Sequence, residues 1–292
     1  MAKILITGGT GLVGTRLTKM LIEQKHEVAI LSRTPKNKNE YKWNVSKDYI
    51  DDKAFLNVDY IIHLAGAGIA DKNWSEKRKK LIIDSRVKTT NLLFKKVIAQ
   101  KLNLKGFVSA SGIGYYGAIT STKIFKETDK PGNDYLSEVC KKWEQAALQF
   151  EAKKIPVTLL RTGIVISKKG GALQKMKTPI ISPLGSGKQY LPWIHIDDLC
   201  NMYISVIEQQ LEGIYNAVAP EHQTSKSFSK LLANNLKRPY IKFGVPSLIL
   251  QLIFGEMSVL LLKGSRISAD KIIETGFKFK FPTLQNTFKN LF

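Results

Sequence analysis

The feature that most constrains the fold is a run of glycines placed directly after a short hydrophobic segment near the start of the chain. The aliphatic run KILIT is typical of a strand that is covered on both faces in a parallel sheet. Gly8, Gly11 and Gly14 follow with the spacing G-x-x-G-x-x-G, and a helical pattern begins within this run. Such glycines permit a tight turn, close approach of the backbone to a pyrophosphate, and close packing of helix on strand. The arrangement predicts a dinucleotide-binding site at the start of the helix.

Strand and helix patterns alternate along the first half of the chain. Hydrophobic strand patterns recur at residues 27–33, 59–66, 105–111 and 155–163. Between them, the spacing predicts a long amphipathic helix over 76–100, and Asp134 is expected to cap a helix that ends near residue 151. This alternation predicts an α/β fold, a Rossmann-type doubly wound parallel sheet with right-handed crossovers.

The composition changes near residue 163 and divides the chain into two regions. We expect residues 1–163 to form mainly the nucleotide-binding Rossmann core, and residues 164–292 to form mainly a small substrate lobe and C-terminal helices. A strand near 213–219 is expected to rejoin the sheet, and the alternating segment GFKFKFP predicts a further strand. The stretch from KKGGALQKM to WIHIDD is rich in glycine, proline and lysine, which predicts ordered loops.

The charge balance narrows the range of partners. The chain carries 45 lysine and arginine residues against 24 acidic ones, a net charge of +21, and only seven of the basic residues are arginine. This composition indicates a lysine-covered surface, with attraction to phosphate-bearing ligands as the alternative. The sequence contains no zinc-finger spacing, aromatic RNA-binding motif or arginine-rich arm, so a nucleic-acid-binding role is not expected.

Cysteine usage and hydropathy favour a cytoplasmic protein. Cys140 and Cys200 form no CxxC pair and the four histidines are scattered, so we expect a reducing compartment and no metal site. The hydrophobic stretch 245–262 is broken by Gly255 and Glu256. It therefore predicts a buried or lobe-covering helix pair and no membrane span, with contact to a membrane surface as the lesser alternative.

The end of the second strand bears on which nucleotide is bound. NAD-binding proteins usually place an acidic residue there for the ribose hydroxyls. In this chain the position is occupied by Leu31, Ser32 and Arg33, with no acid. A guanidinium suits a 2′-phosphate, and the serine hydroxyl can donate a hydrogen bond to it. NADP(H) is therefore favoured over NAD(H), and the alternative is that Arg33 is an ordinary surface residue.

Eight segments connect the chain to a known family. In order they are ITGGTGLVGTRLTKMLIEQKHEVAILSR, HLAGAGI, SRVKTTNLL, SASGIGYYG, VCKKWE, LRTGIVIS, WIHIDDL and GFKFKFPTLQ. Together they resemble the atypical, extended short-chain dehydrogenases described as NAD-dependent epimerase/dehydratase-like or sugar-nucleotide epimerase-like, some of which carry the label cell-division inhibitor. The resemblance covers essentially the whole chain. It implies a Rossmann core, a small C-terminal substrate lobe and a cleft between the two.

The resemblance also implies which residues surround the cofactor. In chain order they are Gly8, Gly9, Gly11, Leu12, Val13, Ser32, Arg33, Leu64, Ala65, Gly66 and Ser109. The first five would form the pyrophosphate loop, and the next two would meet the 2′-phosphate. The three residues at the end of the third strand pattern, Leu64, Ala65 and Gly66, would line the ribose and nicotinamide, and Ser109 would lie on the strand that carries the catalytic hydroxyl in active relatives.

The match fails at the catalytic pair of the family. In active relatives, a tyrosine exchanges a proton with the substrate, and a lysine lowers the tyrosine pKa from about 10 toward neutrality. Counting back from Glu144, the lysine position holds Cys140 and the tyrosine position holds Leu136. Tyr135 is followed four residues later by Val139, so it has no lysine at the required spacing. The standard Tyr-x-x-x-Lys mechanism is therefore not expected.

Other side chains are candidates for the chemistry and for substrate contacts. The hydroxyls expected near the nicotinamide are those of Ser111, Tyr115, Tyr116 and Tyr135. The two adjacent tyrosines have a wall-forming role as the alternative, and no protein donor is needed if substrate or water supplies the proton. The expected substrate contacts are Lys188, Gln189 and Trp193.

The segment WIHIDDL contains one further candidate. His195 has a reference pKa near 6.5 and is able to act as an acid or a base. We favour a structural role, in which Asp197 or Asp198 caps the following helix and the histidine supports the loop.

Two functions fit these observations. The first is an NADP(H)-binding, short-chain dehydrogenase-like oxidoreductase or sugar-nucleotide epimerase-like enzyme that lacks the Tyr-x-x-x-Lys pair. Its substrate would be a small polar molecule, with sugar- and nucleotide-bearing compounds among the options. The second is a non-catalytic NADPH-binding sensor or partner module. Both use the same cofactor loop, and the complete cleft with its lobe favours the enzyme.

Overall fold

The centre of the molecule is a sheet of eight strands. The computed structural model describes residues 1–292. In spatial order the strands are β12 (Gly213–Ala217), β8 (Val157–Thr162), β6 (Gly106–Gly112), β5 (Tyr60–His63), β1 (Lys3–Thr7), β2 (Glu27–Ser32), β3 (Glu40–Asn44) and β4 (Tyr49–Ile50). All neighbours in this sheet are parallel except β3 and β4. The predicted Rossmann-type parallel sheet is confirmed, and the strand expected near 213–219 is β12 at its edge.

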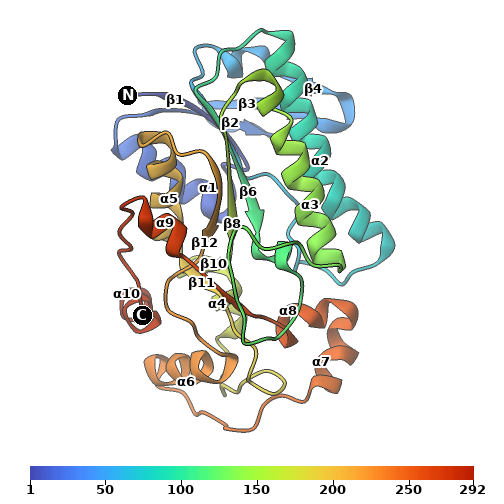
Figure 1. Ribbon diagram of the computed structural model, residues 1–292, viewed down its shortest axis with the longest axis vertical. Coiled ribbons are helices and arrows are strands. Elements are labelled where there is room, and N and C mark those ends of the chain that lie inside the picture. The colour runs from blue at the N-terminus through green and yellow to red at the C-terminus, as the bar shows by residue number, and fades with distance from the viewer.

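Helices cover both faces of the sheet (Figure 1). The helices α2 (Glu76–Ala99) and α3 (Tyr135–Leu148) lie on one face, and α1 (Leu12–Glu23) and α5 (Ile196–Glu208) lie on the other. Because side chains alternate along a strand, Ile4 and Ile6 of β1 pack with residues of α1 and α5, whereas Leu5 packs with residues of α2 and α3. The long helix lies where it is predicted, and Asp134 caps α3 by accepting a hydrogen bond from the amide of Ser137.

The C-terminal part of the chain forms a lobe beside the carboxyl edge of the sheet (Figure 1). Its own sheet joins β10 (Gly170–Gly171), β9 (Ile164–Ser167) and β11 (Trp193–His195). Its helices are α4 (Ala172–Met176), α6 (Ser225–Leu236), α7 (Ser247–Phe254), α8 (Val259–Leu262) and α10 (Leu284–Leu291). The pair β7 (Ile124–Phe125) and β13 (Arg266–Ile267) joins a core segment to the lobe, and α9 (Asp270–Glu274) packs on β12.

Two sequence predictions for the lobe are wrong. The stretch predicted as loops contains β10, α4 and β11, because β11 finds its partner β9 in a segment about thirty residues earlier in the chain. The segment GFKFKFP forms no strand. The amides of Lys280 and Phe281 donate to the two carboxylate oxygens of Asp198, at 2.7 and 2.9 Å, and not to a neighbouring strand.

The hydrophobic stretch 245–262 forms a helix pair, α7 and α8, separated by a 3₁₀ turn at Gly255–Ser258. The pair is predicted correctly, but α7 is not buried. Only Leu250 of this helix is buried, whereas Leu248 and Leu252 are 66% and 79% exposed. No helix in the structure combines the length and the apolar character needed to cross a membrane.

Candidate functional site

The turn between β1 and α1 is packed as only glycines permit. Gly8 has φ +70°, in the left-handed region that side chains disfavour. A Cβ on Gly14 would lie 2.2 Å from the carbonyl oxygen of Gly8, and one on Gly9 would lie 2.7 Å from the side chain of Ile30. The backbone of the turn therefore lies directly against the first turn of α1 and against β2.

The start of α1 has no group of its own to satisfy its first amides. Its N-cap residue, Gly11, supplies no side-chain hydrogen bond, and the first turn contains no acidic residue. Arg16, one turn further along, is held by Asp197 through hydrogen bonds of 2.7 and 2.9 Å. The first N–H groups of a helix lack intrahelical partners and carry the positive end of its dipole. They fit the phosphates of a dinucleotide.

The end of β2 lies beside this turn, because Thr7 and Leu31 are paired across the two parallel strands. Ser32 is buried, and its hydroxyl oxygen accepts a hydrogen bond from a following amide at 3.3 Å. Arg33 is exposed, and its side chain forms no salt bridge within the protein. The nearby carboxylate of Glu40, on β3, is occupied by hydrogen bonds from the loop that precedes it. The guanidinium is therefore available to an external anion.

The segment after β5 lies at the same edge of the sheet. The hydroxyl of Thr7 forms a 2.7 Å hydrogen bond with Nδ1 of His63 and accepts one from the amide of Ala65 at 3.2 Å. Burial lowers the pKa of His63 to about 3, so its ring is neutral. Leu64 lines a cavity at this edge of the sheet, and Ser109, paired with His63 across β5 and β6, is fully buried.

A cavity of about 400 Å³ opens at the carboxyl edge of the sheet. Its core side is lined by Val13, Leu64, Ser111, Gly112, Thr162 and Gly163. Its lobe side is lined by Tyr190, Leu191, Pro192, Val259, Leu260 and Lys263. The strand order reverses between β1 and β5, and open α/β sheets bind their ligands outside the strand ends at such a reversal. Because Val13 belongs to α1 and to the cavity wall, the glycine turn and the cavity form one site.

Helix α3 gives the cavity an apolar wall. Its lining residues are Leu136, Val139, Cys140 and Trp143. Burial raises the pKa of the Cys140 thiol to about 12, so this group is protonated and uncharged. A Cβ on Gly114 would lie 3.2 Å from Cβ of Leu136, which shows how closely the loop after β6 packs on the helix. The α3 wall therefore presents neither a hydroxyl nor an amine to the cavity.

The carboxylate of Glu144, also on α3, connects the ends of β6 and β8. It accepts a 2.7 Å hydrogen bond from the hydroxyl of Ser111, and Nε and Nη2 of Arg161 each donate to it at 2.9 Å. Burial opposes the charge of this arginine, but the hydrogen bonds and charge of Glu144 raise its pKa. Ser111 is thus fixed on the cavity wall with its proton donated to a buried carboxylate.

The two candidate tyrosines after β6 lie on the 3₁₀ turn Ile113–Tyr116. Tyr116 lines the cavity, but its hydroxyl donates to Oδ1 of Asn216 at 2.6 Å and accepts from Nη1 of Arg161 at 3.1 Å. Burial raises its pKa to about 12. Tyr115 lies outside the cavity lining, with Cζ of Arg161 3.3 Å from its ring centroid. Both rings therefore pack around one arginine.

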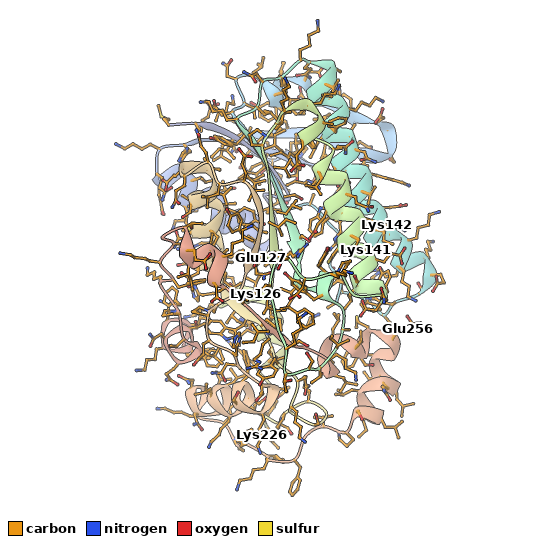
Figure 2. All side chains as sticks on the ribbon, in the orientation of Figure 1. Lys126, Glu127, Lys141, Lys142, Lys226 and Glu256 are labelled. Atoms are coloured by element: carbon orange, nitrogen blue, oxygen red, sulfur yellow. The ribbon has the colours of Figure 1, made fainter.

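Tyr135 is separated from the other candidate hydroxyls. It is the first residue of α3, and its hydroxyl donates to the backbone oxygen of Lys79 at 3.0 Å. Its ring packs edge-on against Trp74 at 4.9 Å. It borders a different, polar groove that also includes Lys141 and Lys142, which Figure 2 shows on α3. The structure therefore places Tyr135 outside the apolar cavity.

The three residues predicted to contact substrate lie beside the cavity and not on its wall. Lys188 is exposed. Gln189 is buried, and its amide donates to the backbone oxygens of Leu184 and Leu261 at 2.9 and 2.7 Å. Trp193 is fully buried in the hydrophobic core of the lobe. The cavity contacts come instead from the residues between them, Tyr190 to Pro192.

His195 itself caps α5, because its Nδ1 accepts a hydrogen bond from the amide of Asp197 at 3.0 Å. The prediction that Asp197 or Asp198 provides the cap is wrong, since both carboxylates have other partners. Asp197 binds Arg16 of α1, and Asp198 accepts the amides of the segment before α10. Burial lowers the pKa of His195 to about 4, so the ring is neutral at pH 7.

Arg86 is a cavity residue that the motifs did not single out. It lies on α2 and lines the cavity, and it is only 9% exposed. A Cβ on Gly66 would lie 3.1 Å from its Cζ, so this glycine leaves room for the guanidinium. A signal for it does exist in the sequence. Arg86 falls on the helical stripe with Ile82 and Leu93, so a charged side chain stands among residues that face the core.

These features define a class of protein: a Rossmann-type nucleotide-binding fold whose C-terminal lobe closes a cavity over the carboxyl edge of the sheet. The model for the NAD dependent epimerase/dehydratase family matches residues 4–217, and a domain of unknown function, DUF1731, matches residues 245–291. The chain belongs to the NAD dependent epimerase/dehydratase family, which confirms the resemblance drawn from its motifs.

Similar proteins match along their whole length. Epimerase family protein SDR39U1 of Mus musculus is 32% identical over 298 residues, 99% of each chain. Epimerase family protein SSP1921 of Staphylococcus saprophyticus is 34% identical over 305 residues, 100% of this chain and 99% of its own. A crystal structure of human epimerase family protein SDR39U1 (isoform 2) with NADPH is 30% identical, with a TM-score of 0.88 over 99% of this chain and 98% of that one. UDP-glucuronic acid 4-epimerase from Bacillus cereus, 17% identical with a TM-score of 0.76 over 99% of this chain and 100% of that one, shares the fold.

Proposed function

We propose that the protein binds NADP(H) at the glycine turn and acts as a short-chain dehydrogenase-like oxidoreductase or epimerase-like enzyme. Its small-molecule substrate would occupy the adjoining cavity. One observation carries this proposal: Val13 lies in the first turn of α1 and also on the wall of the cavity of about 400 Å³. A site for phosphates and a site for a small molecule therefore meet at one residue, at the edge where this class of fold binds ligands.

Arg33 supports NADP(H) over NAD(H) as the nucleotide. Its guanidinium is exposed and unpaired beside the glycine turn. A planar guanidinium binds a phosphate through two parallel hydrogen bonds, whereas the acid usual in NAD-binding proteins would repel it. The human relative whose structure contains NADPH, at 30% identity, supports the same choice.

The residues around the cavity support an unconventional source of the proton. When bound, the nicotinamide would supply or accept a hydride. Leu136 and Cys140 line the cavity where the tyrosine and lysine of active relatives are expected, and neither carries a charge. Ser111 and Tyr116 line it as well, but their hydroxyl protons are donated to buried partners. In this proposal the substrate or water supplies the proton, while the chain positions the substrate and excludes bulk solvent.

Calorimetric titration with NADPH and NADH tests the nucleotide site. We expect NADPH to bind the wild-type protein more tightly, and Arg33→Ala to weaken NADPH by roughly ten- to a hundredfold with little change for NADH. Lys38→Ala, a change at an exposed lysine on the neighbouring loop, is the matched control and should leave both affinities unchanged. Equal affinities for the two nucleotides in all three proteins would refute the role of Arg33, and no binding of either would refute the proposed function.

A second candidate function is a non-catalytic NADPH-binding sensor. The uncharged α3 wall favours it, because Leu136 and Cys140 offer no group for proton transfer. Single-turnover mixing of NADPH-loaded protein with a panel of aldehydes, ketones and keto acids separates the two functions. The enzyme predicts loss of NADPH absorbance with at least one carbonyl compound. The sensor predicts tight NADPH binding with no oxidation by any of them.

A further inference from the structure

The guanidinium of Arg86 is buried in the cavity wall without a counter-ion. Its Nη1 donates to the backbone oxygens of Ala67 and Ile82, at 3.0 and 2.9 Å, and its Cζ lies 4.8 Å from the ring centroid of Trp143. It forms no salt bridge, and its buried Nε has no hydrogen-bond partner. A buried charge without a partner is costly, so proteins seldom retain one unless a ligand completes it.

The guanidinium of Arg86 lines the cavity and has one donor left for a ligand. Nη1 is used by the backbone and Nε is enclosed by the protein, which leaves Nη2 as the donor open to a ligand. Two other arginines of this protein each have a carboxylate partner within the chain: Arg16 binds Asp197 at 2.7 and 2.9 Å, and Arg161 binds Glu144 at 2.9 Å twice. Arg86 has no carboxylate partner of this kind, and its bonds within the protein go to backbone oxygens alone.

No neighbouring side chain neutralises this charge. Cys140 interacts with this charge but remains a thiol, because burial raises its pKa to about 12. Tyr135 also remains neutral, since burial raises its pKa, and its hydroxyl is bonded to a backbone oxygen. Arg78, the other close cation, is bound to the backbone oxygen of Gly68. The positive charge of Arg86 is therefore left for a molecule from outside the chain.

The rest of the cavity wall indicates what the uncharged part of that molecule is like. Of the 30 residues that line it, 19 are hydrophobic, so most of its surface suits an apolar group. A sugar hydroxyl would find few partners here, whereas one planar anion would find the guanidinium. We infer that Arg86 anchors the carboxylate of an otherwise apolar substrate, such as an aryl or alkyl carboxylic acid or keto acid. This inference rests on the proposed function for the chemistry of the cavity but not for the binding itself.

Binding of simple carboxylates tests the inference directly. We would titrate benzoate and hexanoate into the wild-type protein by calorimetry, with and without saturating NADPH, and use benzamide as the neutral isostere of benzoate. We expect saturable binding of a carboxylate but not of the amide. Arg86→Met should weaken it by roughly ten- to a hundredfold, as expected for loss of a charge-assisted hydrogen bond in a buried site, and Arg86→Lys should weaken it less. Thermal unfolding of each variant verifies that it is folded.

Arg33→Ala is the matched control, because it removes an arginine from the nucleotide end of the same site. It should impair NADPH binding and spare benzoate, whereas Arg86→Met should do the reverse. The inference is overturned if neither carboxylate binds the wild type, if Arg86→Met leaves their affinity unchanged, or if that variant loses NADPH affinity to the same degree. Failure of NADPH to bind at all would instead refute the proposed function, since carboxylate binding without nucleotide is measured separately.

Discussion

Two buried arginines contact adjacent residues of α3, but only one of them has a carboxylate partner. Arg161 is 1% exposed and forms two hydrogen bonds with the carboxylate of Glu144. Arg86 is 9% exposed and packs on Trp143, with backbone oxygens as its only acceptors. One charge is thus neutralised within the chain, and the other is not.

The difference separates a structural role from a binding role. A completed buried ion pair holds its elements in place, and breaking it leaves a charge in an apolar environment. Arg161 therefore fixes the strand ends that form the cavity. An unpaired buried charge is costly, and a bound anion would neutralise it. If the two arginines differ in this way, substitutions at the completed pair and at the incomplete one should have unequal effects on stability.

The largest expected effect follows from breaking the completed pair. Glu144→Gln keeps the shape of the side chain but leaves the charge of Arg161 uncompensated. We expect a loss of about 3–5 kcal/mol in the free energy of unfolding, measured by urea denaturation. Glu138→Gln on the same helix is the matched control, because its partner Lys142 is exposed (Figure 2) and the pair contributes at most about 0.5 kcal/mol. Equal losses in the two variants would contradict the structural role of Arg161.

The second effect concerns the tyrosine that completes this network. Tyr116→Phe leaves Asn216 and Arg161 each without one hydrogen bond in the interior. We expect a loss of about 1–3 kcal/mol in the free energy of unfolding. Tyr115→Phe should cost less than about 0.5 kcal/mol, because it keeps the ring that packs on Arg161. If instead Tyr116→Phe retains full stability and abolishes NADPH oxidation, the hydroxyl acts in proton transfer and not in the network.

The fold was predictable wherever the signal is local. The glycine spacing and the alternation of strand and helix patterns are set by neighbouring residues, so the sheet, α2 and the cap of α3 follow from the sequence. The segment GFKFKFP was not predictable in this way. Its alternation reflects burial of Phe277 and Phe281, while its amides bind Asp198, a residue about eighty positions earlier. Hydrogen bonds between residues so far apart in the chain give no signal in the local sequence pattern.

The candidate site likewise has one part that the sequence predicts and another part that it does not. The cofactor turn is a local motif, whereas the partners that occupy Ser111 and Tyr116 lie 33 and 100 residues away. The sequence therefore names these hydroxyls as candidates without showing that they are engaged. Arg86 has a local signal, its place on the buried stripe of α2, but only the structure shows that no acid faces it.

Arg86, the arginine without a carboxylate partner, should contribute little to the free energy of unfolding. Arg86→Met removes an uncompensated buried charge and keeps an apolar stem that is able to pack on Trp143. We expect the free energy of unfolding without ligand to stay within about 1 kcal/mol of wild type or to exceed it. Urea denaturation beside Glu144→Gln makes the comparison direct. A loss as large as that of Glu144→Gln would mean that Arg86 is structural, and the two arginines would then not differ in kind.

The smallest expected effect is electrostatic and involves His63, whose pKa is lowered to about 3 chiefly by burial and, in addition, by the charge of Arg86. The unfolded chain binds the proton below about pH 6.5 and the folded protein only near pH 3, so acidification favours unfolding. This contribution to stability is complete above pH 6.5 and is lost as the pH falls toward 3. Arg86→Met removes one cause of the lowered pKa, so the folded variant protonates His63 more readily and should lose less stability on acidification.

The measurement is the free energy of unfolding at pH 7 and at about pH 3 for wild type and Arg86→Met, in which the variant should lose less than wild type by about 0.5 kcal/mol. Arg33→Met, an exposed charge at the other end of the site, is the control and should parallel wild type. Other titrating groups are shared by all three proteins, so the difference between the losses isolates the coupling of Arg86 to His63. Parallel losses in all three would show that no such coupling exists. The charge of Arg86 would then be screened in the free protein, and its incomplete pair would need a different explanation.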